Sequence, residues 1–187
     1  MEVLQWAREH GCPWDEGTCE AAAENGHQDV VLLARDHGCP WDSNVLRAWR
    51  ECCPELREIW GESEPVTAWQ GVMFGEAGGT DAGRVVAIHL GGIDLTGDMP
   101  AVLRRLTALK TLDLDDNQLT SVPASLGGLA ALTVLHLSRN RLTSVPAELG
   151  GLTALAVLRL HGIQLTSLPA AWEKGGALEQ SGCAIRD

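Results

Sequence analysis

Long hydrophobic runs are missing from this chain. No apolar run approaches the roughly 20 residues that a membrane-spanning helix needs. The first residues, MEVLQWAREH, lack the basic start and the unbroken apolar stretch of a signal peptide. The six cysteines show no disulfide framework, and the neighbours Cys52 and Cys53 lack the CxxC spacing of a structural zinc site. We therefore expect an intracellular, cytoplasmic protein with no membrane partner.

Basic residues are also scarce. The chain has 14 Lys and Arg against 25 Asp and Glu, which gives a net charge of −11. Residues 1–81 hold 16 acidic and 5 basic residues, whereas residues 82–187 hold nine of each. An acidic surface repels phosphate backbones, so we expect no nucleic-acid partner. The uneven distribution, together with six of the seven tryptophans before residue 82, indicates two different segments.

Motifs that carry enzymatic chemistry are absent as well. There is no nucleotide loop, kinase signature or ligase motif. The Gly-rich stretch GEAGGTDAG, residues 75–83, has neither the Lys-Ser/Thr pair of a phosphate loop nor a helix that it could open. It predicts a hairpin turn. We expect no enzyme and no cofactor, and any catalysis would belong to a partner or to a region outside this chain.

The N-terminal segment contains a repeat. HGCPWD occurs at residues 10–15 and again 27 residues later, which indicates stacked supersecondary units. GTCEAAAENGH (17–27) and QDVVLLARDHG (28–38) predict two helices that end at glycine. A small-residue helix, Gly-His and a Val/Leu-rich second helix resemble ankyrin repeats. The resemblance implies about two degenerate ankyrin-like units over residues 1–60.

A second repeat has a period of 23 residues. Its copies are LTALKTLDLDDNQLTSVPASLGG (106–128), LAALTVLHLSRNRLTSVPAELGG (129–151) and LTALAVLRLHGIQLTSLPAAWEK (152–174), with a looser copy at 82–105. LxxLxLxxNxLxxLP resembles the leucine-rich repeat signature. The resemblance implies an α/β solenoid, with short parallel strands on the concave face and inward-pointing leucines. It also implies that Asn117 and Asn140 turn inward and satisfy backbone groups at the bends.

The stretches on either side of this array predict caps, because an open sheet edge invites aggregation. WQGVMF (69–74) followed by RVVAIHL (84–90) is similar to the N-terminal cap of plant-type leucine-rich repeats, where Trp69, Gly71 and Val72 match. We expect a closing strand, CAI, near the C-terminus. The expected division of the chain is an ankyrin-like segment, a linker with a cap hairpin, about four leucine-rich repeats and a C-terminal cap, at 1–60, 61–83, 84–174 and 175–187.

Residues between the inward leucines face the concave surface. Equivalent positions form one line of His89, Asp113, His136 and Arg159, and a neighbouring line of Gly91, Asp115, Ser138 and His161. Parallel strands lie about 4.8 Å apart, so Asp113 is expected between two imidazoles. His89, Asp113 and His136 could hold a metal ion, or the carboxylate could raise the pKa of the histidines. A polar surface that reads a partner is the favoured interpretation, without a metal.

The favoured function is a non-catalytic protein–protein interaction scaffold. The expected contact residues on the concave face are His89, Asp113, Asp115, His136, Ser138, Arg139, Arg159 and His161. The alternative is a substrate-recognition or targeting subunit of a larger signalling or ubiquitin-ligase assembly. A metal-dependent enzyme is the weakest hypothesis, because a shallow face offers little to exclude water. The sequence identifies neither the partner protein nor the oligomeric state.

Overall fold

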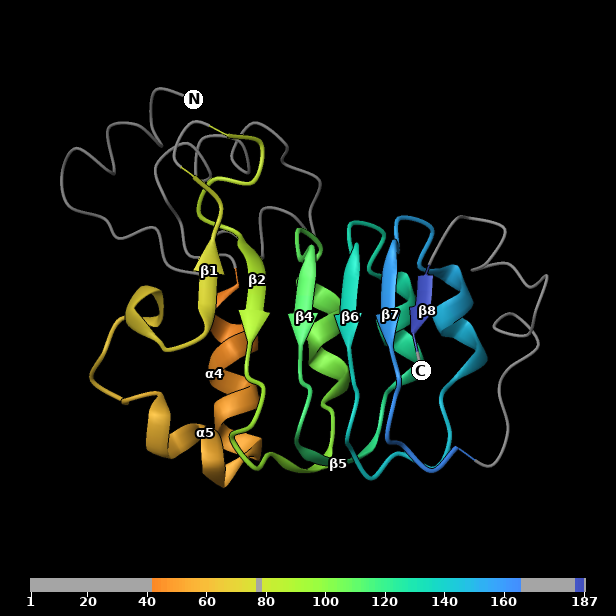
Figure 1. Ribbon diagram of the computed structural model, residues 1–187. Coiled ribbons are helices and arrows are strands. Elements are labelled where there is room, and N and C mark those ends of the chain that lie inside the picture. The colour runs from red at the N-terminus through yellow and green to blue at the C-terminus, as the bar shows by residue number, and fades with distance from the viewer. Residues whose placement is uncertain (1–41, 77–78, 166–183, 187) are drawn as a thin grey trace, which may run out of the picture.

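The computed structural model describes residues 42–76, 79–165 and 184–186 (Figure 1). Within these residues, six strands form one sheet in the order β1-β2-β4-β6-β7-β8. β1 is antiparallel to β2, and every later pair in this sheet is parallel. The short parallel strands implied by the resemblance to leucine-rich repeats are confirmed. The strands are β1 (Val72–Phe74), β2 (Val85–His89), β4 (Thr111–Asp113), β6 (Val134–His136), β7 (Val157–Arg159) and β8 (Ala184–Arg186).

Each coil returns from the sheet through a short 3-10 helix. These are η2 (Ala101–Arg105), η3 (Ala124–Gly128) and η4 (Ala147–Gly151). A proline stands before each one, with φ between −73° and −69°, because its ring fixes the backbone angle at which the turn starts. At one bend of the coils, β3 (Thr96–Asp98) pairs in parallel with β5 (Gln118–Ser121). The repeated proline therefore sets the point at which each coil turns away from the bend.

The leucines of the repeat fill the space between the sheet and the 3-10 helices. One buried leucine per strand pairs with the same leucine of the next coil: Leu112 with Leu135, and Leu135 with Leu158. All three are 0% exposed. Because each coil contributes equivalent leucines, the core continues from coil to coil instead of closing within one.

Asn117 and Asn140 are buried at the bends and link successive coils through hydrogen bonds. The Asn117 side chain donates to Leu90 O at 2.8 Å and accepts from Leu95 N at 2.9 Å, both in the preceding coil. Asn140 repeats the arrangement one coil further on, where its amide donates to a preceding-coil carbonyl and its oxygen accepts from Leu119 N. A buried asparagine thus replaces the backbone partners that a bend cannot supply.

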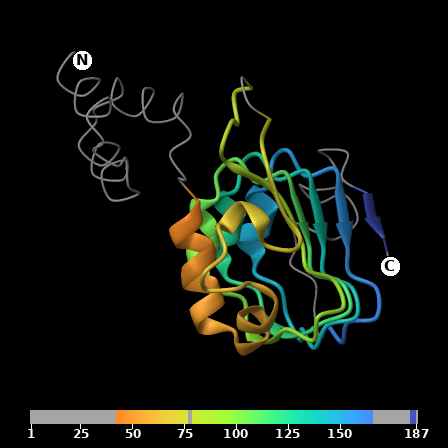
Figure 2. The same ribbon diagram turned by 90° about the vertical axis from the view of Figure 1, so that its left-hand side faces the viewer.

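Helices α4 (Ser43–Cys52) and α5 (Pro54–Ile59) lead into the 3-10 helix η1 (Val66–Ala68) and then β1. Figure 2 shows both α-helices on the side of the molecule opposite to the strands. Three tryptophans join these elements to the core: Trp60 stacks on Trp69 at 4.7 Å between ring centroids, and Trp49 meets Trp60 edge-on at 5.9 Å. All three are at most 2% exposed, so the helices and hairpin form a cap on the first coil.

Gly71 allows the cap hairpin to approach the first coil. Its φ is +80°, and a Cβ placed there would lie 2.1 Å from the carbonyl oxygen of His89. Only glycine fits this combination of backbone conformation and close contact. Trp69 and Gly71 therefore have different roles in the cap: the Trp69 ring stacks on Trp60, and Gly71 lets the hairpin backbone approach His89.

The ankyrin-like interpretation of residues 1–60 is not supported. α4 and α5 fall inside that range, yet they pack into the same hydrophobic core as the leucine-rich coils. The repeated units themselves, before residue 42, lie outside the described residues, and so does most of the expected C-terminal cap. The boundaries proposed for the four segments therefore stay a prediction. Among the described residues, no helix has the length and apolar character needed to cross a membrane.

Candidate functional site

The sheet carries two parallel rows of side chains on the face opposite to the buried leucines. Strand register places His89 beside Asp113, Asp113 beside His136, and His136 beside Arg159. We call these four residues the polar row. Two positions earlier on β2, β4, β6 and β7, the register aligns Ala87, Thr111, Val134 and Val157, and Met73 of β1 lies beside Ala87. We call these five residues the apolar row. The 23-residue period therefore aligns like with like across the concave face.

The polar row is centred on Asp113. Its Oδ2 atom lies 4.0 Å from His89 Nδ1 and 3.7 Å from His136 Nδ1, so the carboxylate lies between two imidazoles. Asp115 Oδ2 lies 3.9 Å from the same His136 nitrogen. His89 is exposed, whereas the His136 side chain is only 15% exposed. His136 is therefore enclosed by two carboxylates, and His89 stands at the open side.

Both carboxylates are also held by backbone N–H groups. Asp113 Oδ1 accepts from Asp115 N at 3.2 Å, and Asp115 Oδ1 accepts from Ser138 N at 2.6 Å. Each aspartate thus uses one oxygen for the backbone and presents the other to His136. The Ser138 backbone N–H orients Asp115. Because Ser138 is 0% exposed, its hydroxyl cannot contact a partner protein.

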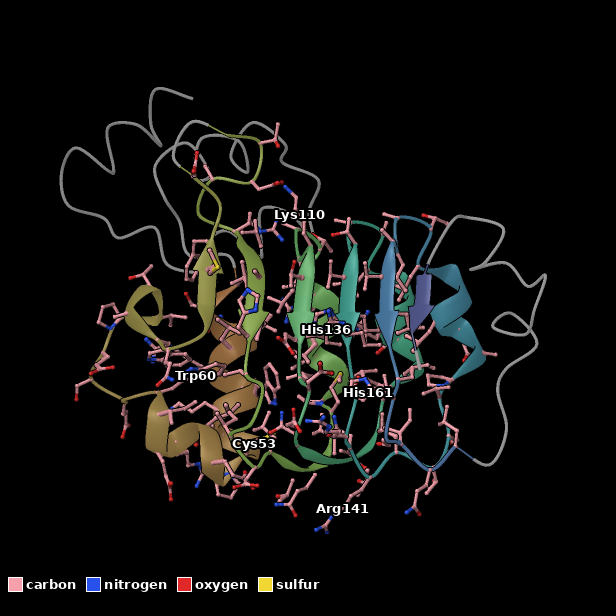
Figure 3. All side chains as sticks on the ribbon, in the orientation of Figure 1. Cys53, Trp60, Lys110, His136, Arg141 and His161 are labelled. Atoms are coloured by element: carbon pink, nitrogen blue, oxygen red, sulfur yellow. The ribbon has the colours of Figure 1, made fainter. Side chains whose placement is uncertain are left out.

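One bend position of every coil adopts left-handed backbone geometry. It is occupied by Gly92, Asp116, Arg139 and Gly162, with φ between 51° and 72°. Arg139 Nη1 pairs with Asp116 Oδ1 at 3.1 Å, and both side chains are well exposed. The pair lies at the rim of the concave face. Figure 3 shows His136 and the half-buried His161 near the carboxyl ends of neighbouring strands.

A surface hollow of about 510 Å³ adjoins the apolar row on the hairpin side. Met73 and Phe74 of β1, Ala87 of β2 and Thr111 of β4 contribute to its lining, and Lys110 stands among them. Met73 is the large hydrophobic side chain that is most exposed in the described part of the chain, at 54%. Sequence reasoning missed this hollow, because it depends on the angle between the cap hairpin and the first coil.

The residues that come closest to a metal-binding arrangement differ from those expected. Ligand atoms of Asp113, Asp115 and His136 all lie within 4.8 Å of one another, and His89 is not in that group. Asp115 was expected only as a partner contact. The acidic run DLDD at 113–116 indicated a second carboxylate near Asp113, but the spacing of strands could not show that the Asp115 carboxylate turns toward His136.

Cys53 is a structural thiol. It is 5% exposed and lies in the core between α4 and α5. Burial raises the pKa of its thiol, which disfavours the reactive thiolate. Its neighbour Cys52 is exposed. The adjacent cysteines thus have opposite surroundings and do not converge on one site.

Comparisons with known proteins agree with the fold. The family profile "Leucine rich repeat" matches residues 85–142 and 107–165. These residues are leucine-rich repeats, and the described part of the chain has a leucine-rich repeat fold with a cap on its N-terminal side. Leucine-rich repeat domains are generally non-catalytic interaction modules. Comparison with curated proteins gives no match.

Several solved structures are similar. The BIR2 ectodomain from Arabidopsis thaliana is 23% identical with a TM-score of 0.54, and the match covers 66% of each chain. The ectodomain of the receptor kinase SOBIR1 from Arabidopsis thaliana is 27% identical with a TM-score of 0.52, covering 66% of this chain and 67% of that one. The leucine-rich repeat protein LIC12759 from Leptospira interrogans is 28% identical with a TM-score of 0.45, covering 53% of this chain. The matched region spans only 24% of the Leptospira protein. Because the two plant structures are ectodomains, a cytoplasmic location for this chain stays a prediction.

Proposed function

We propose that the concave face binds a segment of another protein and that the chain acts as a non-catalytic interaction scaffold. The observation that carries the proposal is the pairing of a polar row with an apolar row across the same strands. Protein interfaces combine an apolar centre with a polar rim, and the two rows supply both on one surface.

Charge changes sign along the concave face. Asp113 of the polar row and its neighbour Asp115 lie in the middle, Arg159 of the polar row lies on β7, and Arg139 lies at the bend. Such an arrangement selects a partner by complementary charges in a fixed order rather than by net charge. The partner segment would present a basic group to the two aspartates and an acidic group to Arg159.

The hollow beside Met73 gives the partner an anchor. An apolar side chain of the partner placed there would contact Met73, Phe74 and Ala87 and would be buried from water. Lys110, which bonds Asp81 at 2.6 Å, borders the hollow. We therefore propose a partner segment that crosses the strands, with its apolar residues over the apolar row and its charged residues over the polar row.

The proposed contact residues are those exposed or half-exposed on this face. Ser138 supports Asp115 from below and is not itself in reach. The set is His89, Asp113, Asp115, His136, Arg139, Arg159 and His161 from the polar side, with Met73 and Val134 from the apolar row.

The proposal is tested by affinity capture with the double variant Asp113→Ala/Arg159→Ala. Proteins recovered from a lysate by the unmodified chain should be lost with this variant. The matched control is Arg104→Ala/Glu148→Ala, which removes the same charges from exposed positions on the 3-10 helices. If both variants recover the same proteins, the binding surface lies elsewhere. A catalytic subunit among the recovered proteins would favour the alternative role, a targeting subunit of a larger assembly.

A further inference from the structure

We propose that Asp113, Asp115 and His136 form a binding site for a divalent transition-metal ion, for which Zn²⁺ is the representative probe. This inference goes beyond the proposed function, because metal binding needs no protein partner. Imidazole and carboxylate together are ligands that Zn²⁺ accepts, with Zn–N and Zn–O distances of about 2.0–2.2 Å.

The three ligand atoms are already close to the required separation. His136 Nδ1 lies 3.7 Å from Asp113 Oδ2 and 3.9 Å from Asp115 Oδ2. Ligands of a tetrahedral zinc ion lie roughly 3.4 Å apart, given metal–ligand distances near 2.1 Å. All three ligand atoms lie within 4.8 Å of one another, so the two carboxylates would rotate toward each other and toward His136 when the ion binds.

The aspartates are oriented for this role by their other oxygens. Backbone N–H groups of Asp115 and Ser138 hold Asp113 Oδ1 and Asp115 Oδ1. Ligands whose second atom is fixed by a hydrogen bond lose less freedom when a metal binds, and such support is common around metal sites. Both Oδ2 atoms consequently face His136 before any ion is present.

His136 Nδ1 supplies an independent observation. It is buried and has no hydrogen-bond partner in the described part of the chain. The hydroxyl of Ser138, two residues further on and 0% exposed, is unpaired in the same way. Three buried side-chain atoms lack a hydrogen-bond partner among the described residues: these two and one carboxylate oxygen of Glu55. Buried polar atoms are rarely left unpaired, so His136 Nδ1, which lies between two carboxylates, points to a ligand at this position.

At residue 91 the first coil carries no side chain beside the Asp113 carboxylate. The position equivalent to Asp115 in that coil is Gly91, and a Cβ added there would come within 3.6 Å of Asp113 Oδ1. The glycine thus adds no side chain next to Asp113 Oδ1. An ion held by three protein groups keeps a further coordination position for water or another ligand.

A protonated imidazole between two carboxylates would give the same atomic arrangement without a metal. The two states are separated by isothermal titration of the purified full chain with ZnCl₂ near neutral pH. We expect one ion per chain. The variants His136→Gln and Asp115→Asn should weaken binding at least tenfold, whereas His161→Gln, which alters an imidazole outside the cluster, should leave it unchanged. Circular dichroism checks that each variant is folded.

A second measurement uses the unmodified protein. Zn²⁺ should protect His136, but not His161, from carbethoxylation detected by mass spectrometry. Titration with Co²⁺ should show no thiolate-to-metal charge-transfer absorption, because the site contains no cysteine. Absence of heat above the dilution control, unchanged affinity in His136→Gln, unprotected His136, or a thiolate band would each overturn the proposal. If ZnCl₂ gives no heat and NMR shows that His136 is protonated near neutral pH, the cluster is an ion pair and not a metal site.

Discussion

Asn117→Ala removes a side chain that satisfies backbone groups in the preceding coil. Asn117 is the hydrogen-bond partner of the Leu95 N–H and the Leu90 carbonyl. It also donates to Leu114 O and Asp115 O, but these carbonyls keep other donors. The substitution therefore leaves two buried backbone groups without a partner.

The expected cost follows from that count. One unsatisfied buried polar group costs about 1–3 kcal/mol, so two cost about 2–6 kcal/mol. Because small domains are stable by only about 5–15 kcal/mol, the variant should lose a large share of its stability. Urea unfolding followed by circular dichroism measures the loss. Native-state hydrogen exchange should show the Leu95 amide losing its protection.

Gln118→Ala is the matched control. Gln118 is the next residue, and its side chain donates to Asp94 Oδ1 at 3.1 Å in an exposed position. Its replacement should change the free energy of unfolding by less than about 0.5 kcal/mol. A loss below about 1 kcal/mol in Asn117→Ala, or equal losses in both variants, would refute the view that the buried asparagine joins the coils.

Three further outcomes follow from individual residues. Arg139→Gly should leave stability unchanged or raise it by up to about 1 kcal/mol, whereas Arg139→Val should lower it by about 1–2 kcal/mol, because φ is 51° there; thermal unfolding compares the two. Gly71→Ala should cost about 2–4 kcal/mol and speed amide exchange in β1, since the new Cβ would meet His89 O. Gly92→Ala has a similar φ with nothing within 4 Å, so a larger loss there than at Gly71 would contradict the steric explanation. Burial raises the pKa of the Asp42 carboxyl, so this group holds its proton more tightly in the folded protein than in the unfolded chain. The free energy of unfolding should therefore fall as pH rises from the ordinary carboxyl range through the raised pKa of Asp42. Asp42→Asn should flatten this part of the stability–pH curve, and an unchanged slope in the variant would refute the role of Asp42.

The 23-residue period allowed the lateral arrangement of the sheet to be predicted from sequence. A period that repeats the same strand once per coil sets residues 23 apart side by side, so His136 follows Asp113 on the next strand. The inward leucines and the inward asparagines were implied by the resemblance to leucine-rich repeats, and the structure shows each asparagine satisfying backbone groups at a bend. These properties repeat from coil to coil and need no knowledge of distant contacts.

The N-terminal helices show where this reasoning stops. The resemblance to ankyrin repeats implied helical units up to residue 60, but the assignment of α4 and α5 to ankyrin-like units was not supported. What decides the packing of α4 and α5 is the contact of Trp49, Trp60 and Trp69 with one another and with the first coil. A local pattern can indicate a helix, but it does not identify the surface on which the helix is buried.

The candidate site divides in the same way. Which residues share a row could be predicted from the sequence, because repeat length and strand pairing are periodic. The sequence could not show that Asp115 rather than His89 completes the cluster around His136, or that Met73 borders a hollow; both depend on how the coils and the cap pack. The physical reason is that the orientation of a side chain depends on backbone donors supplied by the neighbouring coil, such as the Ser138 N–H, and on the packing angle of the cap. Those contacts form only when the coils are stacked.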